Sequence, residues 1–113
     1  MRDVQLYLND ILSSISNIDL FVKGVSKVSF KRNIEKQSAV ARQLEIIGEA
    51  VKNLPEDVRR LCPEIPWKDI AGLRDVMIHS YHRVDVEKIW NVIDKDLPPL
   101  KESIKRIMQE RKT

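Results

Sequence analysis

With 113 residues, the chain is long enough for one domain with a single hydrophobic core, and we expect one helical domain over residues 1–113. Charged residues make up 33% of the chain and only three residues are glycine, which is typical of a helix-rich soluble protein and not of a β-sheet protein or a disordered chain. The formal net charge of +3 permits RNA or another phosphate-bearing partner without requiring one.

Cysteine and histidine are scarce in this chain. The single cysteine, Cys62, excludes an intramolecular disulfide, and His79 and His82 do not complete a zinc-binding spacing with it. We therefore expect no metal ion and no cofactor. No apolar run approaches the roughly 20 residues that span a bilayer, so we expect a cytoplasmic protein that does not contact membranes.

The first predicted helix covers Arg2 to Val22, where apolar residues recur in steps of three and four. A core-facing stripe explains this pattern better than a membrane-surface helix, because the polar face lacks an array of Lys and Arg. Gly24 can end the helix, and the following residues are predicted to form a connection. This region is the most basic of the chain, with Lys23, Lys27, Lys31, Arg32 and Lys36. We interpret it as a solvated face in preference to an RNA contact.

The second long helix is predicted from Asn33 to Leu54. Its apolar positions alternate by four and three, as in a helix of a bundle. They are Val40, Leu44, Ile47, Val51 and Leu54. Ala41 and Gly48 lie on a neighbouring line with little side-chain bulk, which lets another helix approach closely.

Prolines divide the next part of the chain. Pro55 suits the first turn of a short helix that ends near Leu61. The stretch 62–66 then breaks the helix, because its prolines remove backbone donors. Pro66 can open the next helix within its first turn, and Trp67 beside it is predicted to anchor that helix in the core instead of stacking on a base.

A terminal helix is predicted from Asp85, which suits its N-cap. Its buried stripe is Val86, Ile89, Trp90, Ile93, Leu97, Leu100, Ile104 and Ile107. Pro98 and Pro99 predict a bend or two abutting helices. The polar residues from Gln109 to Thr113 are expected to fray. Together, these elements predict an all-α fold, an antiparallel up-and-down bundle of four to five helices.

One short stretch holds Arg, His and Tyr close together in sequence. On a regular helix Arg74 and Tyr81 lie within about 20° of each other in a mainly apolar arc, where a guanidinium needs a counter-ion or a phosphate. His79 points about 140° away from Arg74. The two can meet only if the helix unwinds near Ser80 or if a second copy supplies one of them. Asp75, one turn before His79, can accept an imidazole N–H.

The pattern Arg74-x4-His79-x-Tyr81 resembles the Arg-x4-His-x-Tyr signature of HepT-like toxins, which belong to the HEPN superfamily of small helical proteins. The resemblance covers nearly the whole chain. Further similar segments are a central-helix segment at 44–50, a lead-in at 65–67 with Ile70 and Leu73, and an exit at 84–85 with Ile89 and Trp90. Asp75 also suits the superfamily, which favours a small polar residue after the arginine.

The resemblance implies a toxin of a type VII-like toxin–antitoxin pair that acts as a metal-independent endoribonuclease and forms a homodimer. In this interpretation Arg74 stabilises charge on the RNA phosphate and His79 transfers protons, with Asp75 in support. Attack by the ribose 2′-hydroxyl would leave a 2′,3′-cyclic phosphate. The resemblance further implies that a cognate minimal nucleotidyltransferase antitoxin adenylylates Tyr81 and silences the toxin. A second acid or base would come from the other subunit, from His82 or from water.

Two other classes of function stay open on the sequence alone. One is a binding module that keeps the fold and the dimer, cleaves nothing, and engages a nucleotide or a nucleotidyltransferase. The intact arginine, histidine and tyrosine argue against it, and expression without a partner separates the two because only a toxin arrests its host. The other is a helix-turn-helix DNA reader, which is weaker because the motif helix offers few side chains for base edges.

Overall fold

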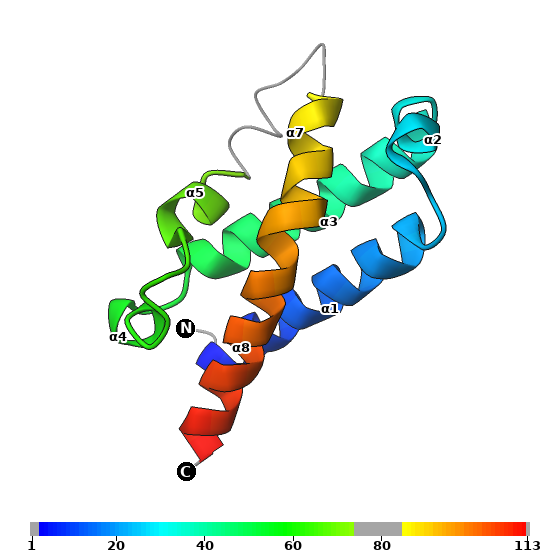
Figure 1. Cartoon of the computed structure of the whole chain (residues 1–113). Helices are drawn as coiled ribbons and strands as arrows, with labels where there is room; N and C mark the ends of the chain where they lie inside the picture. The colour runs from blue at the N-terminus through cyan, green and yellow to red at the C-terminus, as the bar shows by residue number, and fades with distance from the viewer. Residues whose placement is uncertain (1–2, 74–84, 113) are drawn as a thin grey trace.

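The structure, a computed structural model, describes residues 3–73 and 85–112, and within these ranges every regular element is helical (Figure 1). In chain order the elements are α1 (Val4–Val22), α2 (Lys27–Lys31), α3 (Ile34–Lys52), α4 (Glu56–Arg59), α5 (Trp67–Ala71), α7 (Val86–Asn91), the π-helical turn η1 (Val92–Asp96) and α8 (Leu97–Lys112). The prediction of an all-α helical bundle is confirmed.

Two long antiparallel helices, α1 and α3, lie against each other (Figure 1). Each begins with a side-chain cap: the Asp3 carboxylate accepts from the Gln5 N–H at 3.0 Å, and the Asn33 side chain accepts from the Lys36 N–H at 3.0 Å. Helix α1 stops before Gly24, whose φ of +73° is in the region that glycine tolerates best. The buried apolar residues of the two helices are Leu8, Ile11, Ile15, Ile18, Val40, Ala41, Leu44, Ile47, Ala50 and Val51.

The segment between α1 and α3 was expected to be only a connection, and this was wrong, because it contains the short helix α2. The Ser26 hydroxyl caps α2 by accepting from the Ser29 N–H at 3.1 Å, and Phe30 is 0% exposed. The Gln37 side-chain amide donates to the carbonyl oxygens of Phe30 at 2.9 Å and Lys31 at 3.1 Å. The buried Phe30 ring of α2 and the Gln37 amide of α3 therefore hold this helix in place. Neither residue is part of a periodic apolar pattern that would reveal the helix in the sequence.

Helices α7 and α8 form one continuous stretch with η1, which crosses α3 and then α1 (Figure 1). The N–H of Leu97 donates to the carbonyl oxygen of Val92, five residues earlier, as in a π-helix. Because this wide turn shifts the buried face, Val92 is buried where the sequence pattern predicted Ile93. The buried residues of the stretch are Ile89, Val92, Leu97, Leu100, Ser103, Ile104 and Ile107.

The expected bend at Pro98 and Pro99 takes the form of this π-helical turn, which lies just before them. A proline removes the backbone donor that would close the preceding helical turn, so a change of helical geometry ahead of the pair accommodates it. The polar residues from Gln109 onward were expected to fray, but they are helical as far as Lys112. In residues 3–73 and 85–112, no helix combines the length and apolar character that crossing a bilayer requires.

Candidate functional site

Every predicted site residue, Arg74, Asp75, His79 and Tyr81, lies outside the described residues, as does His82. Their predicted roles stay predictions. The structure does describe what precedes and follows them along the chain, which is α5 on one side and α7 on the other (Figure 1). These two helices and the space between them are the frame of the candidate site.

Helix α5 is anchored in the core by its first residue. Trp67 is 8% exposed, and its indole Nε1–H donates to the carbonyl oxygen of Cys62 at 2.9 Å. Ile70 and Leu73 are also buried, and α5 packs on α3. The predicted role of Trp67 as a core anchor is confirmed. Pro66 occupies the N-cap, one position before the helical turn in which it was predicted.

Helix α7 is fixed at its start by a cap and by α2. The Asp85 carboxylate accepts from the Lys88 N–H at 3.1 Å, which confirms the predicted N-cap. The rings of Phe30 on α2 and Trp90 on α7 lie 5.3 Å apart between centroids, tilted by 44°. This aromatic contact joins a helix near the N-terminus to the helix that follows the signature.

Ion pairs strengthen the contact between α2 and α7. Lys27 Nζ lies 2.8 Å from a Glu87 carboxylate oxygen, and Lys31 forms an ion pair with the other oxygen. Hydrogen bonds from Lys27 and then Lys31 lower the pKa of Glu87 from its ordinary 4.5 to about 2. Lys36 Nζ donates to the carbonyl oxygen of Phe21 at 2.8 Å. Three cations of the basic region therefore have partners within the protein, which favours a structural role for it over RNA contact.

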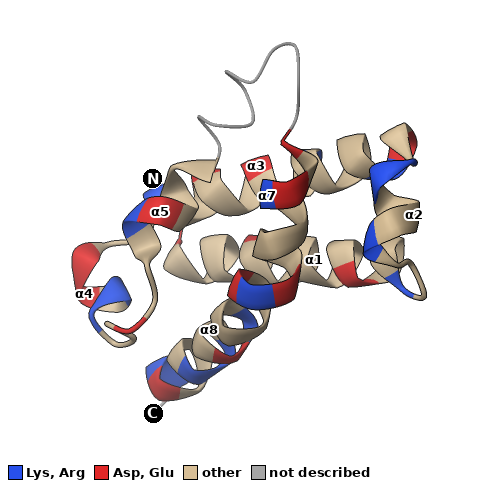
Figure 2. Cartoon of the chain, turned by 45° about the horizontal axis from the view of Figure 1, so that its top comes forward, with Lys and Arg blue, Asp and Glu red and all other residues tan. Residues whose placement is uncertain are grey.

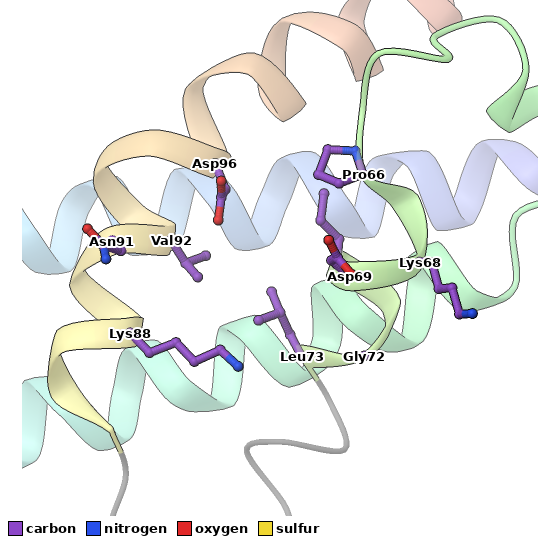
Figure 3. Close-up of a pocket in the computed structure, with 10 residues that line it drawn as sticks. Pro66, Lys68, Asp69, Gly72, Leu73, Lys88, Asn91, Val92 and Asp96 are labelled. Carbon is purple, nitrogen blue, oxygen red and sulfur yellow. The ribbon is translucent and has the colours of Figure 1, made fainter.

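A cavity of about 540 Å³ lies between α5 and the α7–η1 stretch (Figure 3). We call it the site cavity, because Leu73, the last described residue before the signature, is part of its wall. Its lining residues are Pro66, Lys68, Asp69, Ile70, Gly72, Leu73, Lys88, Asn91, Val92 and Asp96. In Figure 3 the side chain of Lys88 extends across the cavity toward Leu73, and the carboxylate of Asp96 enters it from η1.

The lining mixes charge of both signs with an apolar surface. Lys88 and Asp96 take part in none of the ion pairs found among the described residues, so their charged ends can bind a ligand. Asn91 adds an amide that both donates and accepts. An ammonium, a carboxylate and an amide over an apolar surface suit a ligand with an anionic group, hydroxyls and a flat ring. Within residues 3–73 and 85–112, no three His, Cys, Asp or Glu side chains gather as a metal site would require.

Sequence reasoning missed the charged residues of this cavity. Lys88, Val92 and Asp96 recur every four residues, so they share one side of the helical stretch, and this spacing was the available signal. The apolar stripe next to it dominated the pattern and hid the polar one. That α5 supplies the facing wall was not readable from local spacing, because it depends on how both helices pack on α3.

Comparisons with known proteins agree with the signature. A family model described as ribonuclease HepT-like matches residues 11–107. The chain is 44% identical over 101 residues to a "Probable ribonuclease HepT" of Thermococcus cleftensis, covering 89% of this chain and 92% of that protein. It is 42% identical over 112 residues to a "Putative RNase" of Caldanaerobacter subterraneus subsp. tengcongensis, covering 99% of this chain and 100% of that protein.

A third relative differs in length. The chain is 46% identical over 109 residues to a "Gamma-glutamylcyclotransferase and putative RNase" of Methanocaldococcus jannaschii, covering 96% of this chain but only 49% of that protein. The chain thus spans about half of this relative. No solved structure shows a significant match to the chain.

Proposed function

The chain belongs to the HepT-like ribonuclease family, and from this premise we propose that it is an endoribonuclease that serves as the toxin of a toxin–antitoxin pair. The observation that carries the proposal is that the family match over residues 11–107 includes the whole Arg74-x4-His79-x-Tyr81 signature. The site cavity between α5 and α7 supports it, since a ligand-sized space with charged groups lies where the described chain leads into the signature.

The proposed reaction is cleavage of the RNA backbone by its own 2′-hydroxyl. The hydroxyl oxygen attacks the adjacent phosphorus, its proton passes to a base, and the bond from phosphorus to the 5′-oxygen breaks as that oxygen takes up a proton. The products are a 2′,3′-cyclic phosphate and a 5′-hydroxyl. His79 titrates near neutrality and can transfer one of these protons. Arg74 presents a planar fork of donors to the phosphate oxygens as their charge grows.

Tyr81 is proposed as the point of control. A nucleotidyltransferase antitoxin would transfer AMP from a nucleoside triphosphate to the phenolic oxygen, with release of pyrophosphate. The phosphodiester adds a bulky anion close in sequence to Arg74, so the modification can occupy the phosphate-binding group of the toxin itself. This explains why the signature combines a tyrosine with the two proposed catalytic residues.

We further propose that the active form is a homodimer related by a two-fold axis near the signature. Proton transfer in this reaction needs both an acid and a base, whereas the signature holds one histidine, and a second subunit supplies another. His82 and water are the other sources. Light scattering at micromolar concentration tests the assembly, and a monomer under these conditions contradicts it.

The test of the function combines RNA cleavage with intact mass. Wild type, His79→Ala and Tyr81→Phe are expressed with and without a candidate nucleotidyltransferase. We expect His79→Ala to lose a factor of about 10²–10⁴ in cleavage rate, the usual contribution of general acid–base catalysis. We also expect a mass increase of one AMP unit on wild type that is absent from Tyr81→Phe. If wild type neither cuts RNA nor harms its host, and its mass never changes, the chain is a binding module.

A further inference from the structure

A second cavity, of about 400 Å³, lies on the face formed by α4, the loop after it and the start of α5. We call it the α4 cavity. Its lining residues are Glu56, Arg59, Arg60, Pro63, Pro66, Trp67 and Lys68. Three of the seven are cationic and one is anionic, so the lining carries a net positive charge, whereas the site cavity has two lysines and two aspartates. In Figure 2 the ribbons of α4 and α5, each coloured in part for basic and in part for acidic residues, lie at one end of the molecule.

Among the described residues, two of the three cations have no counter-ion. Glu56 lies 2.9 Å from Arg60, in a pair whose two side chains are both more than 70% exposed, so solvent screens it. Within the part of the chain that the structure describes, neither Arg59 nor Lys68 has a carboxylate at ion-pair distance. The nearby carboxylate of Glu64 pairs with Arg106. Arg59 is partly buried, and its Nε has no hydrogen-bond partner in residues 3–73 and 85–112.

The α4 cavity is a neighbour of the site cavity, because Pro66 and Lys68 line both. Figure 3 shows the side chain of Lys68 directed away from Lys88 and from the middle of the site cavity. The ammonium of Lys68 therefore stands at the boundary between the two cavities, on the side away from the facing helix α7. A chain molecule with one residue in the site cavity would meet this ammonium before it reached Arg59 in the α4 cavity.

We propose that the α4 cavity binds a backbone phosphate of the RNA substrate, outside the bond that is cleaved, through Arg59 and Lys68. A guanidinium matches two phosphate oxygens at once, and an ammonium adds a point charge beside it. Because the two cavities share Pro66 and Lys68, a single ligand that reaches both is favoured. An RNA strand bound in the site cavity is such a ligand, whereas an acidic protein surface is not. This inference rests on the proposed ribonuclease function and extends it to substrate binding.

The first experiment measures RNA affinity across a range of salt concentrations. A labelled single-stranded RNA of about 20 nucleotides is titrated with the full chain carrying His79→Ala, which keeps the RNA intact. Arg59→Gln/Lys68→Gln is compared with Lys23→Gln/Arg32→Gln, which removes the same charge from two exposed residues on either side of α2. Helix α2 lies at the end of α3 that is far from α4 and α5 (Figure 1). We expect the first pair to weaken binding and to reduce the slope of log affinity against log salt by about 0.7 for each phosphate that the protein no longer neutralises. The control pair leaves the slope unchanged.

The second experiment uses the cleaving enzyme and two substrate lengths. Arg59 lines the α4 cavity and not the site cavity, so Arg59→Gln should raise KM for the long RNA more than KM for a dinucleotide. Lys68→Gln alone should also raise KM for the long RNA, at an exposed residue where the change does not disturb folding.

The outcomes separate the two proposals. If wild type cleaves RNA but both pairs of variants show the same KM and the same salt slope, the inference is wrong and the ribonuclease function stands. If wild type cleaves no RNA, the proposed function fails. If Arg59→Gln/Lys68→Gln then also leaves the salt slope of RNA affinity unchanged, the inference fails as well. If Arg59→Gln/Lys68→Gln weakens binding of the nucleotidyltransferase but not of RNA, the α4 cavity recognises an acidic protein and the RNA assignment is overturned.

Discussion

The indole Nε1 of Trp67 donates a hydrogen bond to the carbonyl oxygen of Cys62 at 2.9 Å, and thereby ties the first residue of α5 to the loop that precedes it. The ring itself is 8% exposed, so the side chain fills core volume and satisfies a buried acceptor at once. Since α5 forms one wall of the site cavity and borders the α4 cavity, this contact sets the position of the helix that both cavities share.

Replacing Trp67 separates its two contributions. Trp67→Phe keeps most of the apolar area and removes the donor. The Cys62 carbonyl still accepts from the Ile65 N–H at 3.2 Å, so we expect a loss of about 0.5–1.5 kcal/mol in the free energy of unfolding, the usual net contribution of one hydrogen bond. Trp67→Ala also opens a void and should cost about 3–5 kcal/mol. Urea unfolding followed by circular dichroism measures both values. A Trp67→Phe variant as stable as wild type would show that the hydrogen bond contributes nothing.

The contact of Glu87 with Lys27 and Lys31 predicts a pH-dependent stability. The pKa of Glu87 is lowered to about 2, so the pairing stabilises the fold above pH 4.5 and is lost as the pH falls from 4.5 through 2. We expect Glu87→Gln to be less stable than wild type near pH 6 and equal to it near pH 2. Salt should reduce the difference because these side chains are exposed.

The control for Glu87 is Glu35→Gln, which removes one carboxylate from an exposed position near the start of α3. Its stability relative to wild type should not follow the same pH course. A constant difference between wild type and Glu87→Gln from pH 2 to pH 7 would contradict the assignment of the lowered pKa to this contact.

The π-helical turn predicts which of two neighbouring residues tolerates a charge. Val92 is 4% exposed and Ile93 is only partly buried. We expect Val92→Asp to cost on the order of 3–5 kcal/mol, as other unpaired buried charges do, and Ile93→Asp to cost less. Thermal unfolding of the two variants measures the order. The reverse order would indicate a regular α-helix whose inward residue is Ile93.

Arg74→Lys tests whether the site requires a fork of donors or only a positive charge. Lysine keeps the charge but cannot present two parallel N–H groups to a phosphate, so we expect the rate of RNA cleavage to fall by about 10²–10³. Single-turnover kinetics with excess enzyme measure the chemical step. Arg42→Lys, an exposed change on α3, should keep the full rate. An unchanged rate in Arg74→Lys would mean that charge alone suffices.

The sequence predicted the long helices well because their signals are local. The stripes of α1 and α3, the cap at Asp85, and the end of α1 at Gly24 each depend on a few neighbouring residues. Helix α2 escaped prediction because no periodic pattern marks it. The Phe30 ring contacts Trp90 of α7, and the Gln37 amide of α3 donates to the Phe30 and Lys31 carbonyl oxygens.

For the site, the sequence by itself determined the family and the candidate residues Arg74, His79 and Tyr81, since a spaced signature can be recognised without knowledge of how the chain folds. Only the tertiary structure decided which residues surround it. Asp69 and Lys88 lie 19 positions apart and line one cavity because α5 and α7 both pack on α3. The local periodicity of apolar residues determines which face of each helix packs on the core. The space between α5 and α7, however, depends on how the buried faces of both helices fit against α3.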